Sequence, residues 1–166
     1  MSEQNHSPFD DQPAQGSISR RLSLAIFSVM PELRQYASAI QSGEKDGMSL
    51  NLIIPSPTGD EARLCQVWVD EVATPSIGFG PSHTHERPDD AGIAVILDLL
   101  RAILADQVLI IEDAGGAYSG SGGWIDLRDP EALEEELTSP YSPGRALLKS
   151  WSGKADRPVS TDTLAP

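Results

Sequence analysis

The stretch Ser76-Ile-Gly-Phe-Gly-Pro-Ser-His-Thr-His-Glu86 joins a predicted strand to the longest predicted helix of the chain. Its first four residues are compatible with a strand, and Gly80-Pro81 predicts a turn. Asp89-Asp90 then predicts the start of a helix that runs to about residue 105. Strands predicted on both sides of this helix in the chain favour an α+β fold. The apolar positions that form a wide stripe along the helix are Ile93, Ile96, Leu97, Leu100, Ile103 and Leu104.

Upstream of this stretch, the sequence predicts one helix and two further strands. Residues 22–41 carry apolar residues at three- and four-residue spacing, which predicts a helix that Pro31 bends or divides. Residues 48–54 alternate cleanly between apolar and polar side chains, and residues 61–72 do so over most of their length. Together with residues 76–79 these two segments predict an antiparallel meander.

Downstream of the long helix, the sequence predicts three more strands and one short helix. The strands are expected at 108–111, 124–127 and 145–151, and the helix at 129–137. The expected fold is therefore a single α+β domain over residues 21–154. Its antiparallel sheet of about six strands is covered by the long helix and the N-terminal helix. Residues 1–20 and 155–166 hold too few apolar residues to fold, so we expect a disordered N-terminal tail and a flexible C-terminal tail.

The charge of the chain limits the partners that it is expected to bind. Twelve basic residues stand against 25 acidic residues, which gives a net charge of −13. Such a surface repels nucleic acid and anionic lipid, and it speeds encounter with a basic protein. No apolar run approaches the roughly 18 residues that cross a membrane. We therefore expect a basic protein partner, no nucleic acid and no membrane.

Cys65 is the only cysteine, so the chain has no internal disulfide, which fits a reducing compartment. The neighbouring residues are apolar, which favours a buried thiol over a nucleophile. An export signal is not expected after Arg20-Arg21, because Ser23 and Ser28 interrupt the short apolar run that follows. A cytoplasmic location is the expectation.

His83 and His85 are the only residues with the spacing of a metal-binding pair. In an extended segment, residues two apart point the same way, so both imidazoles could reach one zinc ion. Glu86, Asp89 or Asp90 could add a carboxylate. The alternative is that both histidines are polar residues of an exposed loop before the helix.

Known enzyme families with a His-x-His pair need further groups that the sequence does not supply. Metalloproteases and deubiquitinases of the His-Ser-His type need a serine and an aspartate at the positions of Ile93 and Ile96. Cupins need a glutamate within residues 87–90, and two-histidine phosphoesterases need a second His-x-Ser/Thr motif. A metal-dependent hydrolase is therefore the alternative hypothesis, and an enzyme is not the first expectation.

Acidic and aromatic residues are concentrated between residues 112 and 141. Carboxylates beside aromatic side chains are typical of an interface with a basic protein, although a charged run is also typical of a solvated surface. The residues expected to contact a partner are Glu112, Asp113, Tyr118, Trp124, Asp126, Asp129, Glu131, Glu134, Glu135 and Tyr141.

Four short features within residues 50–153 carry a resemblance to a known group of proteins. They are Gly78-Phe-Gly-x-x-His-x-His85, the apolar helix, Val108-Leu-Ile-Ile111 and Lys149-Ser-Trp-Ser-Gly153. Together they resemble small bacterial immunity-type proteins of polymorphic or contact-dependent toxin systems. The resemblance implies a non-enzymatic inhibitor without a cofactor, which binds and neutralises a cognate basic toxin, often a nuclease. It also implies that Phe79 and Trp151 anchor the core. The oligomeric state stays open.

Overall fold

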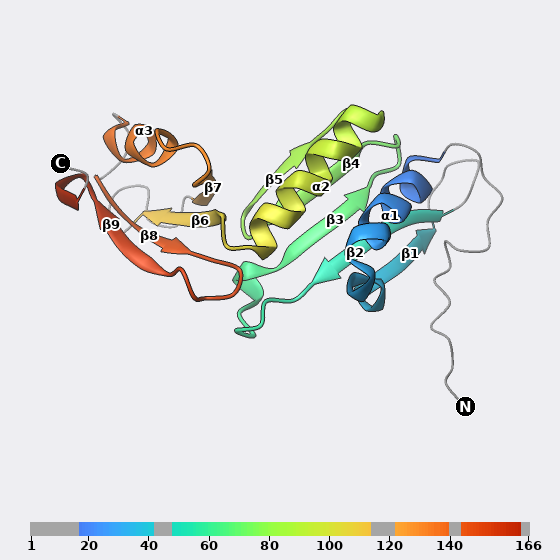
Figure 1. Cartoon of the computed structure of the whole chain (residues 1–166), viewed down its shortest axis with the longest axis horizontal. Coiled ribbons are helices and arrows are strands. Elements are labelled where there is room, and N and C mark those ends of the chain that lie inside the picture. The colour runs from blue at the N-terminus through green and yellow to red at the C-terminus, as the bar shows by residue number, and fades with distance from the viewer. Residues whose placement is uncertain (1–16, 42–47, 114–121, 140–143, 164–166) are drawn as a thin grey trace. The chain divides into compact units, whose positions relative to one another are not determined.

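The computed structural model describes residues 17–41, 48–113, 122–139 and 144–163 (Figure 1). The chain divides into two compact units. The first consists of residues up to 54, 66–78 and 83–98, and the second of residues 55–65, 79–82 and 99 onward. Helices and antiparallel sheets make an α+β fold, as predicted. The prediction of one sheet of about six strands is wrong, because the strands form one sheet of five and another of four.

The first unit contains most of the five-stranded sheet. Its strands are β1 (Ala37–Gln41), β2 (Met48–Ile54), β3 (Cys65–Val69), β4 (Pro75–Phe79) and β5 (Ser82–His85), in that order. The helices are α1 (Ile18–Val29), the 3-10 helix η1 (Pro31–Tyr36) and α2 (Asp90–Leu104). Figure 1 shows α1 and the first turns of α2 on one face of this sheet.

Two hydrogen bonds hold helix α1 in place, one at its N-terminus and one on its buried face. Ser17 caps it, because the hydroxyl of Ser17 accepts a hydrogen bond from the Arg20 backbone N–H at 3.2 Å. Two residues further, the buried Ser19 hydroxyl accepts the backbone N–H of Leu50 at 3.1 Å and so joins α1 to β2. The apolar residues buried in this unit include Ile18, Leu22, Ile26, Phe27, Leu33, Leu50, Leu52, Ile54, Val67, Val69, Ile77, Ile93 and Ile96.

The N-terminal helix ends earlier than the sequence predicts. Pro31 starts the 3-10 helix η1, and residues 37–41, which were predicted to be helical, form β1. This segment pairs antiparallel with β2, so that Ala37 lies opposite Leu52 and Ser38 opposite Asn51. Pairing with the next strand outweighs a weak local helix pattern, because the backbone hydrogen-bonding groups of β2 need a partner.

The second unit contains the four-stranded sheet and a short helix. Its strands are β7 (Gly122–Asp126), β6 (Val108–Asp113), β8 (Arg145–Lys149) and β9 (Arg157–Ser160), in that order. The helix α3 (Ala132–Thr138) and two 3-10 helices, η2 (Glu61–Arg63) and η3 (Thr161–Thr163), complete the unit. Its core cluster consists of Leu109, Ile111, Ile125, Leu137, Ala146, Leu148 and Val159.

Strand β9 lies in the segment that was predicted to be a flexible tail. It pairs antiparallel with β8, and Val159, only 8% exposed, packs into the core cluster opposite Ala146. Arg157 and Pro158 are exposed. A strand with one buried apolar residue gives almost no periodic signal, so composition alone predicts a tail. The predicted tail at residues 1–20 is described only from Ser17, and α1 already begins at Ile18.

A hydrogen-bonded network joins residues 55–65 to the turn after β8. Arg63 donates from Nη1 to the backbone oxygen of Ser150 at 3.0 Å and to Asp156 at 2.8 Å, and from Nε to Asp60 at 3.0 Å. In the same region, Ser56 Oγ donates to the backbone oxygen of Trp151 at 2.6 Å. These hydrogen bonds hold the turn against residues 55–65.

The two residues that the resemblance implied as core anchors differ in burial. Phe79 is completely buried. Trp151 is half-buried, and its indole N–H is buried without a hydrogen-bond partner in the described chain. No helix among the described residues is both long and apolar enough to cross a membrane.

Candidate functional site

The predicted site residues fall on two separate surfaces, one in each unit. His83 and His85 belong to the five-stranded sheet of the first unit. The described acidic residues belong to the second unit, on or next to β6, β7 and α3. Each surface is described by itself below.

His83 and His85 lie on a strand and not in a loop. They belong to β5, whose exposure alternates, so that both histidines are exposed while Ser82 and Thr84 are half-buried. The two imidazoles therefore point to the same side, as their spacing predicted. Their ring centroids lie 4.9 Å apart with planes inclined at 76°. The alternative hypothesis placed them in an exposed loop; they are exposed, but they lie on a strand.

Trp68, which has no functional role in the sequence-based hypotheses, lies beside the two histidines on this face. Its ring centroid lies 5.9 Å from that of His83 and 6.2 Å from that of His85. Strand β4 lies between β3 and β5 and turns only Ser76 and Gly78 to this side, because Ile77 and Phe79 are buried on the other. Because Ser76 and Gly78 are small, the rings of Trp68, His83 and His85 can meet above β4.

Apart from Ile53, the rest of this face is largely polar, and part of it is internally hydrogen-bonded. Gln66 Nε2 donates to Asn51 Oδ1 at 2.7 Å, and Ser38 Oγ donates to the backbone oxygen of Asn51 at 3.2 Å. We call this side of the sheet, which is opposite to the helices, the open face. Its described residues include Ser38, Ser49, Asn51, Ile53, Gln66, Trp68, Ser76, Gly78, His83 and His85.

Ser76 holds His85 in place. The hydroxyl of Ser76, which is completely buried, lies 2.7 Å from His85 Nδ1, and it also lies 3.4 Å from the backbone oxygen of Thr74, to which it donates. The donor in this hydrogen bond depends on the tautomer of His85: in one tautomer Ser76 donates to Nδ1, and in the other Nδ1–H donates to the Ser76 oxygen. In the second case the lone pair of His85 stands on Nε2, the nitrogen away from Ser76.

The carboxylates predicted to complete a metal site have other contacts. Asp89 Oδ1 accepts the Gly92 backbone N–H at 2.9 Å at the start of α2, and Asp90 is ion-paired with Arg21. Glu86 accepts from the hydroxyl of Thr84 at 3.4 Å. Within the described ranges, no group of three or more His, Cys, Asp or Glu side chains is placed to hold one metal ion.

On the second surface, two of the predicted contact residues are paired within the unit. Glu112 on β6 lies 2.7 Å from Lys149 on β8. Asp126 on β7 accepts a bidentate pair from Arg128 at 2.6–3.1 Å, and this hydrogen bonding lowers the pKa of Asp126 below its ordinary value despite partial burial. These two carboxylates therefore contribute little net charge to the surface.

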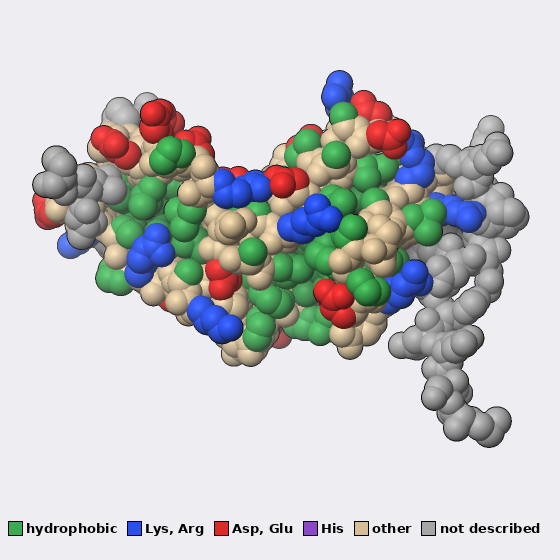
Figure 2. Space-filling view, viewed as in Figure 1, with side chains coloured by type: hydrophobic (Ala, Val, Ile, Leu, Met, Phe, Trp, Pro, Cys, Tyr) green, Lys and Arg blue, Asp and Glu red, His purple; other side chains and the backbone are tan. Residues whose placement is uncertain are grey.

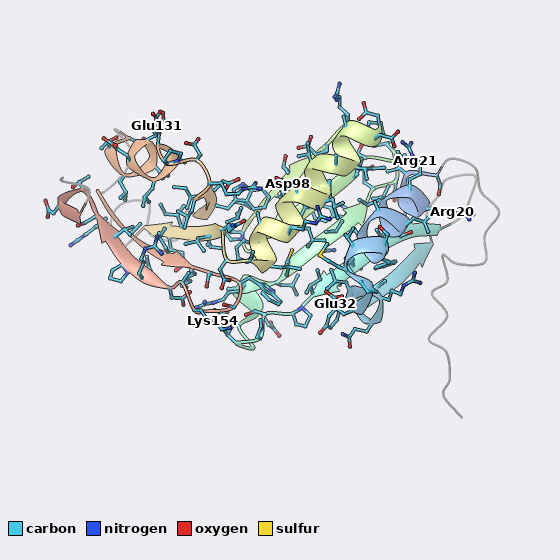
Figure 3. All side chains as sticks on the ribbon, in the orientation of Figure 1. Arg20, Arg21, Glu32, Asp98, Glu131 and Lys154 are labelled. Atoms are coloured by element: carbon cyan, nitrogen blue, oxygen red, sulfur yellow. The ribbon has the colours of Figure 1, made fainter. Side chains whose placement is uncertain are left out.

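Helix α3 and Glu131, the residue just before it, carry carboxylates that are not paired in this way. Glu131, Glu134 and Glu135 are exposed, and with Thr138 they line a shallow depression of about 320 Å³. No described lysine or arginine forms an ion pair with these three glutamates. Figure 2 shows acidic side chains gathered over α3, and Figure 3 shows Glu131 projecting away from its ribbon.

The remaining predicted contact residues are less informative. Asp129 accepts the Glu131 backbone N–H at 3.0 Å, which makes it part of the turn before α3. Trp124 is half-buried on β7, and Asp113 ends β6 but its side chain is not described. Tyr118 and Tyr141 lie outside the described residues.

Comparison with known proteins gives no relative to set beside these two surfaces. The chain matches no family model, no curated protein and no solved structure.

Proposed function

We propose that the chain is a non-enzymatic inhibitor of the immunity type, which binds a cognate basic toxin through α3. The observation that carries this proposal is the difference between the acidic residues of the second unit. Glu112 and Asp126 are neutralised by neighbouring cations, whereas Glu131, Glu134 and Glu135 are exposed and unpaired within the described chain. Exposed carboxylates on one helix are available to the lysines and arginines of a partner.

The charge of the whole chain supports a basic protein as the partner. A net charge of −13 attracts a cationic surface and repels nucleic acid and anionic lipid. A toxin that cuts nucleic acid needs a basic substrate-binding surface, which an acidic inhibitor would cover. The proposal therefore names a nuclease-like toxin as the class of partner and the cytoplasm as the place where it is neutralised.

The proposal is tested with the purified full chain and with the basic proteins encoded beside its gene. We expect one of these proteins to bind the chain and to lose its toxic or nuclease activity as the chain is added. A stoichiometric inhibitor reaches complete inhibition at a fixed ratio of the two proteins, without turnover. Full activity of every such protein in the presence of excess chain would contradict the proposal.

The role of α3 needs its own comparison. In a variant with Glu131→Gln, Glu134→Gln and Glu135→Gln, we expect weaker inhibition, mainly because association is slower. A matched control carries Glu32→Gln, Glu61→Gln and Glu71→Gln, which removes the same charge from exposed positions elsewhere. Equal inhibition by the two variants would mean that only net charge matters and that α3 is not the interface.

A metal-dependent hydrolase is the second candidate function. It is supported by the side-by-side imidazoles of His83 and His85. Hydrolysis would also need a general base or a third ligand, so this candidate rests on the histidine pair alone. Zinc-dependent cleavage of an ester, peptide or phosphoester that is lost in a His83→Gln/His85→Gln variant would favour it over the inhibitor.

A further inference from the structure

The open face of the five-stranded sheet holds a cluster that the proposed inhibitor surface does not use. His83 and His85 project to the same side of β5, and Trp68 lies beside both rings, with centroids 4.9, 5.9 and 6.2 Å apart. Both histidines are exposed. Imidazole is the most frequent neutral metal ligand in proteins, so two exposed imidazoles at this separation are suited to share one ion.

The spacing of the two rings fits one metal ion. Two nitrogens bound to one tetrahedral ion, each at about 2.1 Å, lie roughly 3.4 Å apart. Rings whose centroids are 4.9 Å apart reach that separation by small side-chain rotations, because each nitrogen extends beyond its own ring centre. Since the two residues are held on one strand, little backbone movement is needed.

Ser76 supplies the second feature of a built metal site. Its hydroxyl lies 2.7 Å from His85 Nδ1 and so fixes the orientation of the ring, and in the tautomer that carries Nδ1–H this N–H donates to Ser76 and leaves Nε2 for a metal ion. Metal-binding histidines commonly donate their other N–H to a fixed acceptor, which sets the tautomer and the ring orientation. Ser76 is completely buried, so its hydroxyl group is held in a fixed position beside His85.

The type of donor identifies the class of metal. We propose that His83 and His85 bind one divalent transition-metal ion through their imidazole nitrogens, with water in the remaining positions and Trp68 next to the ion. Two neutral imidazoles without a thiolate suit Cu(II), Ni(II) and Zn(II), and they do not suit the hard ions Mg(II) and Ca(II). The affinity order expected for such a site places Cu(II) above both Ni(II) and Zn(II). This inference does not rest on α3 or on a toxin.

The position of Trp68 gives a direct measurement. The untagged, metal-free full chain is titrated with Cu(II), Ni(II), Zn(II) and Mg(II). Calorimetry measures binding, and quenching of tryptophan fluorescence shows whether the bound ion lies close to a tryptophan. We expect saturable binding of Cu(II) with quenching of Trp68, weaker binding of Ni(II) and Zn(II), and none of Mg(II). A Trp68→Phe variant should keep the calorimetric binding and lose most of the quenching.

Matched variants separate this site from other histidines. Replacement of both His83 and His85 by Gln should abolish saturable binding, and because both side chains are exposed, the fold should persist by circular dichroism. Ser76→Ala should weaken binding about tenfold through loss of the oriented ring. The control is His6→Gln, which removes the third histidine and should change nothing.

Two results would overturn the proposal. One is the absence of saturable Cu(II) and Zn(II) binding to the wild-type chain. The other is unchanged binding in the His83→Gln/His85→Gln variant, which would locate the metal elsewhere. Neither result bears on the inhibitor, whose test uses a different unit and a different readout.

Discussion

The guanidinium of Arg63 lies 2.8 Å from the carboxylate of Asp156, 93 residues later in the chain. The Arg63 side chain is only 11% exposed, and it also bonds Asp60 and the backbone oxygen of Ser150. One side chain therefore joins residues 55–65 to the β8–β9 turn. A partly buried arginine with several acceptors contributes more to stability than a surface ion pair does.

Replacement of Arg63 by Met should lower the free energy of unfolding by about 2 kcal/mol at neutral pH. Methionine keeps the length of the apolar stem but removes the charge and all donors, so Asp156 and the Ser150 carbonyl lose partners. Urea unfolding measures the change. Lys154→Met, an exposed cation in the same turn, is the control and should stay within about 0.5 kcal/mol of the wild type. An equal effect of the two substitutions would contradict this role for Arg63.

The same network predicts a loss of stability in acid. Hydrogen bonding by Arg63 lowers the pKa of Asp60. The pKa of Asp156 is also lowered, because the Ser150 N–H and Arg63 together outweigh its partial burial, which acts in the opposite direction. Carboxyls with a depressed folded pKa stabilise the protein above their ordinary value of 3.8, and this contribution is lost as the pH falls through the folded pKa. The difference between wild type and Arg63→Met should therefore be largest near pH 7 and should shrink below about pH 4. A difference that stays constant between pH 7 and pH 3 would rule out the ionic part of this network.

Two glycines with positive φ give a test of packing in the second unit. At Gly80 (φ +59°) an added Cβ would lie 2.5 Å from Ile110 Cδ1 and 3.0 Å from the backbone oxygen of Ala62, whereas at Gly59 (φ +74°) it would meet nothing within 4 Å. Gly59→Ala should therefore lower the free energy of unfolding by about 1 kcal/mol, which is the cost of placing a side chain on a left-handed backbone. Gly80→Ala should cost at least 1 kcal/mol more, because Ile110 must also move. Thermal or urea unfolding of the two variants, side by side, measures the difference; equal losses would show that the contact at Gly80 relaxes freely.

The thiol of Cys65 should be unreactive in the folded protein. It is completely buried on β3, and burial raises the pKa of the Cys65 thiol to about 12. A disulfide reagent at pH 8 should label it slowly in the native state and within minutes in urea, with a native rate that follows the unfolding equilibrium. Rapid labelling of the native protein would mean that β3 opens far more often than its burial implies.

Elements with long apolar periodicity were predictable from the sequence, and short paired strands were not. Helix α2 and strand β2 lie where fifteen and seven residues of regular pattern predicted them. Strands β1, β5 and β9 are four or five residues long. Such segments are too short to show a periodic pattern of their own, and each is held by pairing with the strand that precedes or follows it in the chain.

Parts of the candidate sites were likewise predictable from local spacing, whereas other parts depend on strand pairing. The spacing of His83 and His85 was enough to predict that they point to one side. The approach of Trp68 depends on the order β3-β4-β5 and on the small Ser76 and Gly78 between, which only strand pairing reveals. Likewise, the Glu112–Lys149 pair depends on the register of β6 with β8, so the sequence could not separate it from the glutamates of α3.

The most direct test of the inhibitor proposal is the rate of association with the basic toxin as a function of salt. The wild-type chain is compared with the Glu131→Gln/Glu134→Gln/Glu135→Gln variant and with the Glu32→Gln/Glu61→Gln/Glu71→Gln control, which has the same net charge. Association guided by α3 should be about tenfold slower in the first variant at low salt and nearly unchanged in the control, and the difference should narrow as salt rises. Identical association rates for all three proteins would contradict the account.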